Sequence, residues 1–204
     1  MIGLKFANHG DRNVHAVALT FDDGPNPSAT AEILNILDSF NVKASFFVIG
    51  KRCMESRTLL ERLFENGHLV GNHTFSHSLG DFKACGETIK SIIGAEPKYV
   101  RPPYFNLSLC QSEEKYLNTK FIVTGDVDSK DYSDIEPKDV VENVLNYTKN
   151  GSIIDFHDGS ENDSEMADRS IKTITALPKI INLLLEQKFN FLRLDEMPLI
   201  FKDF

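Results

Sequence analysis

The chain has 204 residues, of which 41% are hydrophobic and 25% are charged, and its formal net charge is −8 at pH 7. This composition is typical of a globular protein with a substantial core, and we expect residues 1–204 to form a single domain. The acidic balance argues against a nucleic-acid partner, and no apolar run approaches the roughly 18 residues of a membrane span. No basic segment followed by an apolar one stands at Met1, so the sequence shows no signal peptide and a cytoplasmic location stays open.

Short apolar segments alternate with amphipathic ones along the chain. The apolar segments predict strands at residues 14–21, 44–49, 68–71, 99–101, 120–124, 152–156 and 190–194. The amphipathic segments predict helices at about 28–40, 55–66, 83–93, 108–117, 137–147 and 171–187. Pro178 is expected to break or restart the last helix. We also expect an acidic surface loop at 159–169 and a tail at 198–204 that packs on the outside.

This alternation implies a parallel sheet, either doubly wound or closed into a barrel. No glycine-rich phosphate loop follows the first strand, which counts against a nucleotide-binding doubly wound fold. The cysteines fit no metal or redox motif, so the pairing of Cys53, Cys85 and Cys110 stays open. The sequence by itself therefore indicates an α/β fold with a parallel sheet.

Two adjacent carboxylates, Asp22 and Asp23, end the first predicted strand, which the Gly-Pro-Asn-Pro sequence then terminates. Adjacent strand residues point to opposite faces, so both side chains can serve one site only where the strand ends and twists. Ionised carboxylates this close repel each other, and a cation would relieve the repulsion. A solvated turn explains the motif equally well.

A pair of histidines, His73 and His77, follows the third predicted strand. At a spacing of four residues both rings can reach one metal from a single helical turn. With Asp22 or Asp23 they would supply two nitrogens and one oxygen, leaving a position open for water or substrate, as in catalytic zinc sites. Surface histidines at this spacing are common, so the pair alone is a weak signal.

Three further polar clusters follow predicted strands, where parallel sheets and barrels place their active sites. Arg101-Pro102-Pro103-Tyr104 would present an arginine and a tyrosine on a stiff turn, and Arg101 could pair with a carboxylate. Residues 126–132 form an acidic segment, which on its own is best explained as a solvated loop. Strand alternation puts Ile153, Asp155 and His157 on one face, where a lone histidine is more often structural than catalytic.

In order and spacing these clusters (TFDDGP at 20–25, HTFSH at 73–77 and RPPY at 101–104) resemble those of the polysaccharide deacetylases. This group, carbohydrate esterase family four or the NodB homology domain, includes chitin and chitooligosaccharide deacetylases, peptidoglycan N-acetylglucosamine deacetylases and acetylxylan esterases. The resemblance covers about residues 16–194. It implies a distorted (β/α) barrel with about seven mainly parallel strands, and a secreted or cell-wall-associated protein.

The resemblance also implies the roles of the metal-binding and base residues. Asp22 matches the catalytic base. Asp23, His73 and His77 match the ligands of a divalent metal, Zn²⁺ or Co²⁺. Arg101 matches the residue that orients the base.

The proton donor and the substrate site follow from the same resemblance. His157 matches the catalytic histidine, and Asp131 matches the carboxylate that tunes it. Tyr104 matches the position whose backbone N–H helps to hold the oxyanion. Tyr104, Tyr132 and Asp155 fall where the family lines its substrate site.

Three positions depart from the family pattern. Asp155 stands where a leucine usually lines the groove for the acetyl methyl group, and an unpaired charge there costs on the order of a few kcal/mol. Asp155 could instead pair with His157 or Arg101, or recruit the metal. Phe105 replaces a glycine, so we expect difficulty in adopting positive φ there. Tyr132 replaces a tryptophan, which is a minor change because tyrosine can also pack as a wall.

These features favour metal-dependent hydrolytic removal of N-acetyl groups from chitin or another N-acetylglucosamine polymer. Two alternatives stay open because of Asp155 and Phe105. One is a weakened or inactive homologue that binds glycan through the same cleft. The other is a deacylase for a different substrate, such as a small acylated amide or an O-acetyl xylan.

Overall fold

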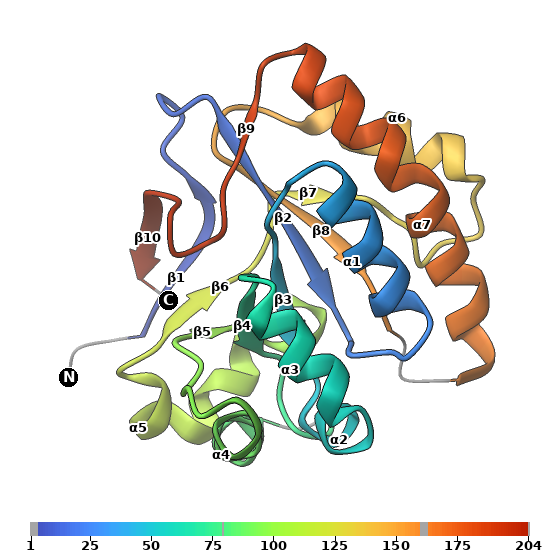
Figure 1. Ribbon diagram of the computed structural model, residues 1–204. Coiled ribbons are helices and arrows are strands. Elements are labelled where there is room, and N and C mark those ends of the chain that lie inside the picture. Colours follow the sequence, from blue (N-terminus) through green and yellow to red (C-terminus); the bar gives the residue numbers. More distant parts are fainter. Residues whose placement is uncertain (1–3, 79, 160–162, 204) are drawn as a thin grey trace.

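A sheet closed into a barrel forms the centre of the molecule (Figure 1). The computed structural model describes residues 4–78, 80–159 and 163–203. The ring runs β1-β6-β5-β4-β3-β2-β8 and is closed by a pairing between β1 and β8. Neighbouring ring strands are parallel, except at that antiparallel closure. The ring strands are β1 (Lys5–Gly10), β2 (Ala16–Asp22), β3 (Ser45–Val48), β4 (Leu69–Asn72), β5 (Tyr99–Val100), β6 (Phe121–Val123) and β8 (Ser152–His157).

The predicted barrel of about seven mainly parallel strands is confirmed, but its membership differs by one strand. The sequence gives no clear alternation at β1, and that strand was missed although it closes the ring. The last predicted strand is the short β9 (Asn190–Phe191), which pairs with β2 outside the ring. Two further strands also add outside it: β7 (Val127–Asp128) pairs with β8, and β10 (Leu199–Asp203) pairs with β1.

Helices cover the outside of the barrel (Figure 1). They are α1 (Ala29–Ser39), α2 (Gly50–Glu55), α3 (Arg57–Glu65), α4 (Phe82–Ile93), α5 (Glu114–Leu117), α6 (Pro137–Tyr147) and α7 (Asp163–Glu186). The helix predicted at 55–66 begins later, after a break at Ser56 that separates α2 from α3. The one predicted at 108–117 is mainly a 3-10 helix, Leu107–Glu113. Among the described residues no helix has both the length and the apolar character needed to cross a membrane.

Helix α7 corrects two predictions. It runs through Pro178 without a break. A proline inside a helix removes one hydrogen bond, but Leu177 and Ile181 are fully buried on either side of it, and their packing holds both halves in line. The acidic segment predicted as a loop at 159–169 is helical from Asp163 onward, and residues 160–162 lie outside the described residues.

Successive side chains of β2 lie alternately in two different environments. Val17, Leu19 and Phe21 face the helices and pack in the larger apolar cluster. Ala16 and Ala18 belong to a second cluster, with Phe47 of β3 and Ile153 of β8. Since side chains alternate, Thr20 and Asp22 continue this second, inward row. The barrel interior is therefore apolar towards the amino ends of the strands and polar towards their carboxyl ends.

Candidate active site

The two neighbouring aspartates turn towards the same site because the chain changes direction between them. Asp22 is the last residue of β2 and is paired in register with His157 at the end of β8. Asp23 follows with φ = 75°, a left-handed conformation that an ordinary strand residue does not adopt. The next position must be glycine, because a Cβ at Gly24 would collide with the carboxylate of Asp158. The expectation that both carboxylates serve one site only where the strand ends is therefore met.

Three buried side chains converge next to Asp22. Oδ1 of Asp23 lies 2.9 Å from Nε2 of His77 and 3.4 Å from Nε2 of His73. One ligand atom from each of the three residues lies within 4.8 Å of the others. His73 is oriented by its other nitrogen, because Nδ1–H donates to the carbonyl oxygen of Arg101 at 2.8 Å and leaves Nε2 facing the cluster.

This cluster fits a divalent cation. Oδ1 of Asp23 is buried and accepts no hydrogen bond of normal geometry, although two imidazole nitrogens lie close to it. Two imidazole nitrogens and one carboxylate oxygen this close together are a donor set that suits zinc. Burial acts to raise the pKa of Asp23, but the contacts with His73 and His77 outweigh it and hold the pKa well below its usual range. Asp23, His73 and His77 could therefore hold Zn²⁺ or a similar cation.

The two histidines do not share a helical turn, so that prediction is wrong. The loop after β4 bends sharply, with φ = 68° at Thr74 and φ = 61° at His77. Two side chains outside the predicted motifs, those of Asn72 and Asp81, hold it in place. Oδ1 of Asn72 accepts from the backbone N–H of Thr74 at 2.9 Å, and Oδ1 of Asp81 accepts from another N–H of this loop at 2.8 Å.

Arg101 lies completely buried beneath the aspartates. Its Nε donates to the carbonyl oxygen of Val123 at 3.3 Å and its Nη2 to that of Thr124 at 3.0 Å. The guanidinium carbon lies 4.1 Å from the ring centre of Phe47 and 5.4 Å from that of Phe105. Carbonyl oxygens at the end of β6 and two aromatic rings thus fix the position of this cation.

The remaining nitrogen of Arg101 is shared between two carboxylates. Nη1 lies 2.8 Å from Oδ1 of Asp22, 2.7 Å from Oδ1 of Asp155 and 2.9 Å from Oγ1 of Thr20. It has two hydrogens for these three oxygens. Burial, and after it the charge of Asp22, raise the pKa of Asp155 well above its usual value against the opposing charge of Arg101. Of the pairings considered for Asp155, the structure has the one with Arg101.

On the other side of Asp22 stands a histidine–aspartate pair. Nδ1 of His157 lies 2.8 Å from Oδ1 of Asp131, while Oδ2 accepts from the backbone N–H of His157 at 2.8 Å and from the hydroxyl of Thr173 at 2.5 Å. Asp131 is completely buried, so the predicted solvated loop is wrong at this residue. Thr173, in α7, was not anticipated, and no sequence motif marks it.

The pair has opposite pKa shifts. Burial by itself lowers the pKa of His157, but the charge of Asp131 and the hydrogen bond to it, followed by other nearby carboxylates, raise the pKa well above its ordinary value. Burial acts to raise the pKa of Asp131, but the charge of His157 and the hydrogen bonds from His157 and Thr173 lower it overall. The imidazolium–carboxylate form of the pair is thus favoured near neutral pH.

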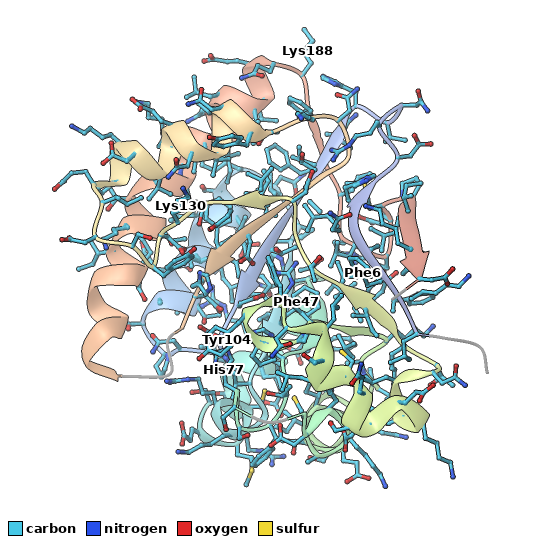
Figure 2. The ribbon with its side chains drawn as sticks, turned by 180° about the vertical axis from the view of Figure 1, so that it is seen from behind. Phe6, Phe47, His77, Tyr104, Lys130 and Lys188 are labelled. Carbon is cyan, nitrogen blue, oxygen red and sulfur yellow. The ribbon has the colours of Figure 1, made fainter. Side chains whose placement is uncertain are left out.

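Two tyrosines border the site. The ring of Tyr104 lies 5.1 Å from that of His77, and Figure 2 shows the two side by side. The ring of Tyr132 stands at 86° to that of His157 at 5.6 Å, and its hydroxyl donates to Asp128 at 2.8 Å. Tyr104 is 76% exposed and Tyr132 is 45% exposed, so both present ring surface to a ligand.

Phe105 adopts the conformation that we expected it to resist. Its φ is 54°, next to φ = 56° at Tyr104. Non-glycine residues in this region cost of order 1–3 kcal/mol each and persist only where their surroundings hold them. Here the N–H of Phe105 donates to the carbonyl oxygen of Pro102 at 3.1 Å, and the ring lies over Arg101. The turn is therefore strained rather than displaced.

A further buried carboxyl, that of Asp158, directly follows His157. Asp158 is completely buried, accepts from the hydroxyl of Thr30 at 2.5 Å through Oδ2, and has no partner at Oδ1. Burial raises its pKa to about 7 despite the hydrogen bond from Thr30. It packs against Gly24 and so supports the turn that carries the aspartates.

The arrangement as a whole suits a hydrolase site: a cluster that could hold a metal, a carboxylate beside it, and a histidine whose raised pKa favours the protonated form. A match to the polysaccharide deacetylase family covers residues 9–116, more than half of the chain. The chain belongs to the polysaccharide deacetylase family, the group also called carbohydrate esterase family four or the NodB homology domain.

Two named relatives show how far the similarity extends along the chain. The chain is 37% identical over 194 residues to a chitooligosaccharide deacetylase of Sinorhizobium fredii, a match that covers 85% of this chain and 87% of that one. It is 34% identical over 185 residues to the peptidoglycan-N-acetylmuramic acid deacetylase PdaC of Bacillus subtilis, and that match covers 86% of this chain but only 39% of the longer relative.

The fold agrees with a solved structure of the family. A peptidoglycan N-acetylglucosamine deacetylase, crystallised with 4-naphthalen-1-yl-N-oxidanyl-benzamide, superimposes with a TM-score of 0.82 at 31% identity. The superposition covers 94% of this chain and 92% of that one. The family is therefore one of hydrolases that remove acetyl groups from carbohydrates, and its barrel is the one described above.

Proposed function

We propose that this chain is a metal-dependent deacetylase that removes N-acetyl groups from N-acetylglucosamine units of chitin, chitooligosaccharide or a related cell-wall glycan. The observation that carries the proposal is the convergence of two imidazole nitrogens on the buried Oδ1 of Asp23, at 2.9 Å and 3.4 Å, next to Asp22. The names of the relatives, which act on peptidoglycan and chitooligosaccharides, support the class of substrate. We further propose that residues 1–204 act as one catalytic domain associated with the cell wall.

The metal-binding residues and the catalytic base have different roles in the first step of the reaction. Asp23, His73 and His77 would hold the cation. A divalent cation such as Zn²⁺ or Co²⁺ would polarise the acetyl carbonyl and lower the pKa of the attacking water. Asp22 takes the proton from that water, as a general base within reach of the cluster. Arg101 holds Asp22 in position through its 2.8 Å hydrogen bond.

The other residues act on the tetrahedral stage and on the leaving group. The backbone N–H of Tyr104 helps to hold the oxyanion, in a turn that the prolines before it stiffen. His157, kept protonated by Asp131, gives its proton to the departing amine. Tyr104 and Tyr132 form walls for the sugar. The products are acetate and a free amino sugar.

The alternative of a weakened homologue rests on one observation. Asp155 lies 2.7 Å from the same Arg101 nitrogen that holds Asp22, so the two carboxylates compete for one cation. Asp155 stands where the family usually has a leucine beside the acetyl methyl group, and a carboxyl there disfavours the methyl and, when ionised, repels acetate. Substrate would then bind in the cleft and turn over slowly.

The test is acetate release from N-acetylglucosamine oligomers by protein of measured zinc or cobalt content. We expect release that depends on the metal and that Asp22→Asn reduces by about 100- to 10,000-fold, the usual contribution of a general base. The metal content of Asp22→Asn serves as the control, since the ligand set is unchanged. Full metal occupancy without acetate release would contradict the proposal and leave the weakened homologue as the better account.

A further inference from the structure

A second pocket lies at the opposite end of the barrel from the candidate active site. Its volume is about 460 Å³, within the roughly 300–1,000 Å³ typical of small-molecule sites. Its lining includes the first residues of three neighbouring ring strands, Leu69 of β4, Tyr99 of β5 and Phe121 of β6. The side chains of the active site instead follow the last residues of these parallel strands, so the two sites occupy different mouths of the barrel.

Three aromatic rings give this pocket flat apolar surface. Phe64 and Phe121 are each 42% exposed, and Tyr99 is half-buried. The rings of Tyr99 and Phe121 lie 5.2 Å apart and are tilted by 32°. The ring of Phe121 also lies 5.6 Å from that of Phe201 in β10, which holds it in place. Partly exposed rings fixed by neighbours offer contact area at a low cost in conformational entropy.

In the polar part of the wall, most charged side chains are paired with a charge of opposite sign. Arg193 donates from Nε and Nη2 to the two carboxylate oxygens of Asp195, both at 3.0 Å, and from Nη1 to the carbonyl oxygen of Gly67 at 2.8 Å. Glu96 is paired with Lys120 at 2.5 Å. Lys98 also lines the pocket, but the other charges of the wall compensate each other, so the wall suits a neutral ligand with many hydroxyl groups better than a highly charged one.

His68, another lining residue, contributes a neutral ring. It is 3% exposed, and its Nδ1 accepts from the backbone N–H of Ala44 at 3.1 Å. A backbone N–H can only donate, so Nδ1 is unprotonated and the proton of the neutral ring sits on Nε2. Nε2 is buried and has no hydrogen-bond partner. Burial lowers the pKa of His68 to about 4, which keeps the ring neutral.

We propose that this pocket is a second saccharide-binding site, which holds a sugar unit of the glycan chain away from the unit that reacts. The C–H face of a pyranose stacks on Phe121 and Tyr99, and its hydroxyl groups bind Arg193 and Asp195. The class of ligand rests on the proposed function, whereas the pocket itself does not. Its role would be to retain a long glycan on the enzyme between cleavage events.

The experiment is an NMR titration of ¹⁵N-labelled protein carrying Asp22→Asn, to prevent turnover, with an N-acetylglucosamine tetramer. We expect two groups of backbone amides to shift with separate binding curves. One group surrounds Tyr99, Phe121 and Asp195, and the other surrounds His77 and Tyr104. Shifts in the active-site group alone, at saturating tetramer, would overturn the proposal.

Substitutions then test the assignment. Phe121→Ala should weaken binding at the pocket roughly three- to tenfold, the usual contribution of aromatic contacts, and leave the active-site group unchanged. Phe121→Leu keeps an apolar side chain without the flat ring, and should weaken binding similarly if Phe121→Ala fails to fold. Tyr147→Ala is the matched control, since Tyr147 is 61% exposed on α6 and does not line the pocket. Pocket shifts that survive both Phe121 substitutions would contradict the stacking role.

Failure of this proposal and failure of the proposed function are distinguishable. Acetate release from the tetramer by protein with Asp22 intact tests the function alone. Acetate release without pocket shifts refutes only the second site, and pocket shifts without acetate release refute only the deacetylase.

Discussion

Each mouth of the barrel contains a histidine with little solvent exposure, and the surroundings of these two histidines, His157 and His68, shift their pKa values in opposite directions. His157, at the carboxyl mouth, faces the buried carboxylate of Asp131 at 2.8 Å, and its pKa is raised well above the ordinary value. His68, at the amino mouth, accepts a hydrogen bond from a backbone N–H, and burial lowers its pKa to about 4. Burial alone favours neutral imidazole, and a carboxylate partner reverses that preference. The same residue is thus suited to donate a proton at one mouth and to remain neutral at the other.

Backbone conformation separates the two mouths as well. Eight non-glycine residues have positive φ in the described chain; five of them lie around the candidate active site (Asp23, Thr74, His77, Tyr104 and Phe105), and a sixth, Lys130, directly precedes Asp131. Two others, Asn41 and Lys188, follow helices α1 and α7. Strained backbone that persists at one end of a fold indicates that side chains are being held in directions that ordinary strands and helices do not allow. The carboxyl mouth has the character of a reaction site, and the amino mouth that of a binding pocket.

The largest expected effect comes from removing the carboxylate of Asp131, which raises the pKa of His157 and which His68 lacks. Asp131→Asn keeps the shape of the side chain but removes the charge that raises the pKa of His157. We expect kcat to fall by about 100- to 10,000-fold, the usual contribution of a positioned proton donor. We also expect the alkaline limb of the pH–rate profile to move to lower pH, because the unpaired imidazolium loses its proton sooner. Acetate release measured from pH 5 to 10 checks both.

Asp128→Asn is the control for that substitution, since Asp128 lies in the same segment and binds the hydroxyl of Tyr132 rather than His157. It should leave the alkaline limb in place. An unchanged limb in Asp131→Asn would mean that His157 is not the group that titrates there.

A smaller and opposite effect is expected at Asp155. Asp155→Leu removes the carboxylate that shares Arg101 with Asp22, and leaves the guanidinium to the base alone. We expect kcat/KM for acetate release to rise by about tenfold, which corresponds to about 1.4 kcal/mol of transition-state stabilisation. Asp155→Asn keeps the shape but cannot ionise, and should give a smaller rise. An unchanged or lower rate in both variants would show that Asp155 supports the site rather than impairing it.

The third effect concerns stability and depends on His68. Its folded pKa of about 4 lies below the ordinary value of about 6.5, so between these limits the unfolded chain binds more protons than the folded one. Stability should therefore rise with pH through this window and fall as the pH drops below about 6.5. The contribution of His68 to the loss between pH 7.5 and pH 5 is about 2 kcal/mol.

The matched variant is His68→Asn, whose Oδ1 can still accept from the N–H of Ala44 but does not titrate. Urea unfolding at pH 7.5 and pH 5 measures the difference. The wild type should lose about 2 kcal/mol more than the variant over this interval. Equal losses would indicate that His68 is protonated in the folded protein, and that the amino mouth is not the neutral region described above.

The sequence determined most of the barrel and the identity of the site. Periodicity located β2, β3, β4, β5, β6 and β8 to within a residue or two, because apolar alternation is a local property of a strand between a core and its helices. Order and spacing of the motifs brought Asp22, Asp23, His73, His77, Arg101 and His157 into one family pattern, and the structure gathers them at one mouth of the barrel.

Only the tertiary structure decided the remainder, because it depends on contacts between distant segments. β1 has no local signal and is a strand because it closes the ring against β8. Asp131, which the sequence alone places in a solvated loop, is completely buried. The hydroxyl of Thr173 in α7, the backbone N–H of His157 and Nδ1 of its ring converge on the carboxylate. Phe105 takes positive φ because the surrounding turn holds it over Arg101.

The local sequence pattern likewise does not decide whether Asp155 supports or impairs catalysis. Strand alternation gave its face, but its partner is an arginine 54 residues away in sequence. Asp22 and Asp155 share the two hydrogens on Nη1 of Arg101. The burial of each carboxyl and its share of these hydrogens decide which of the two Arg101 stabilises more. Such a balance exists only once β2, β5 and β8 have brought Asp22, Arg101 and Asp155 together.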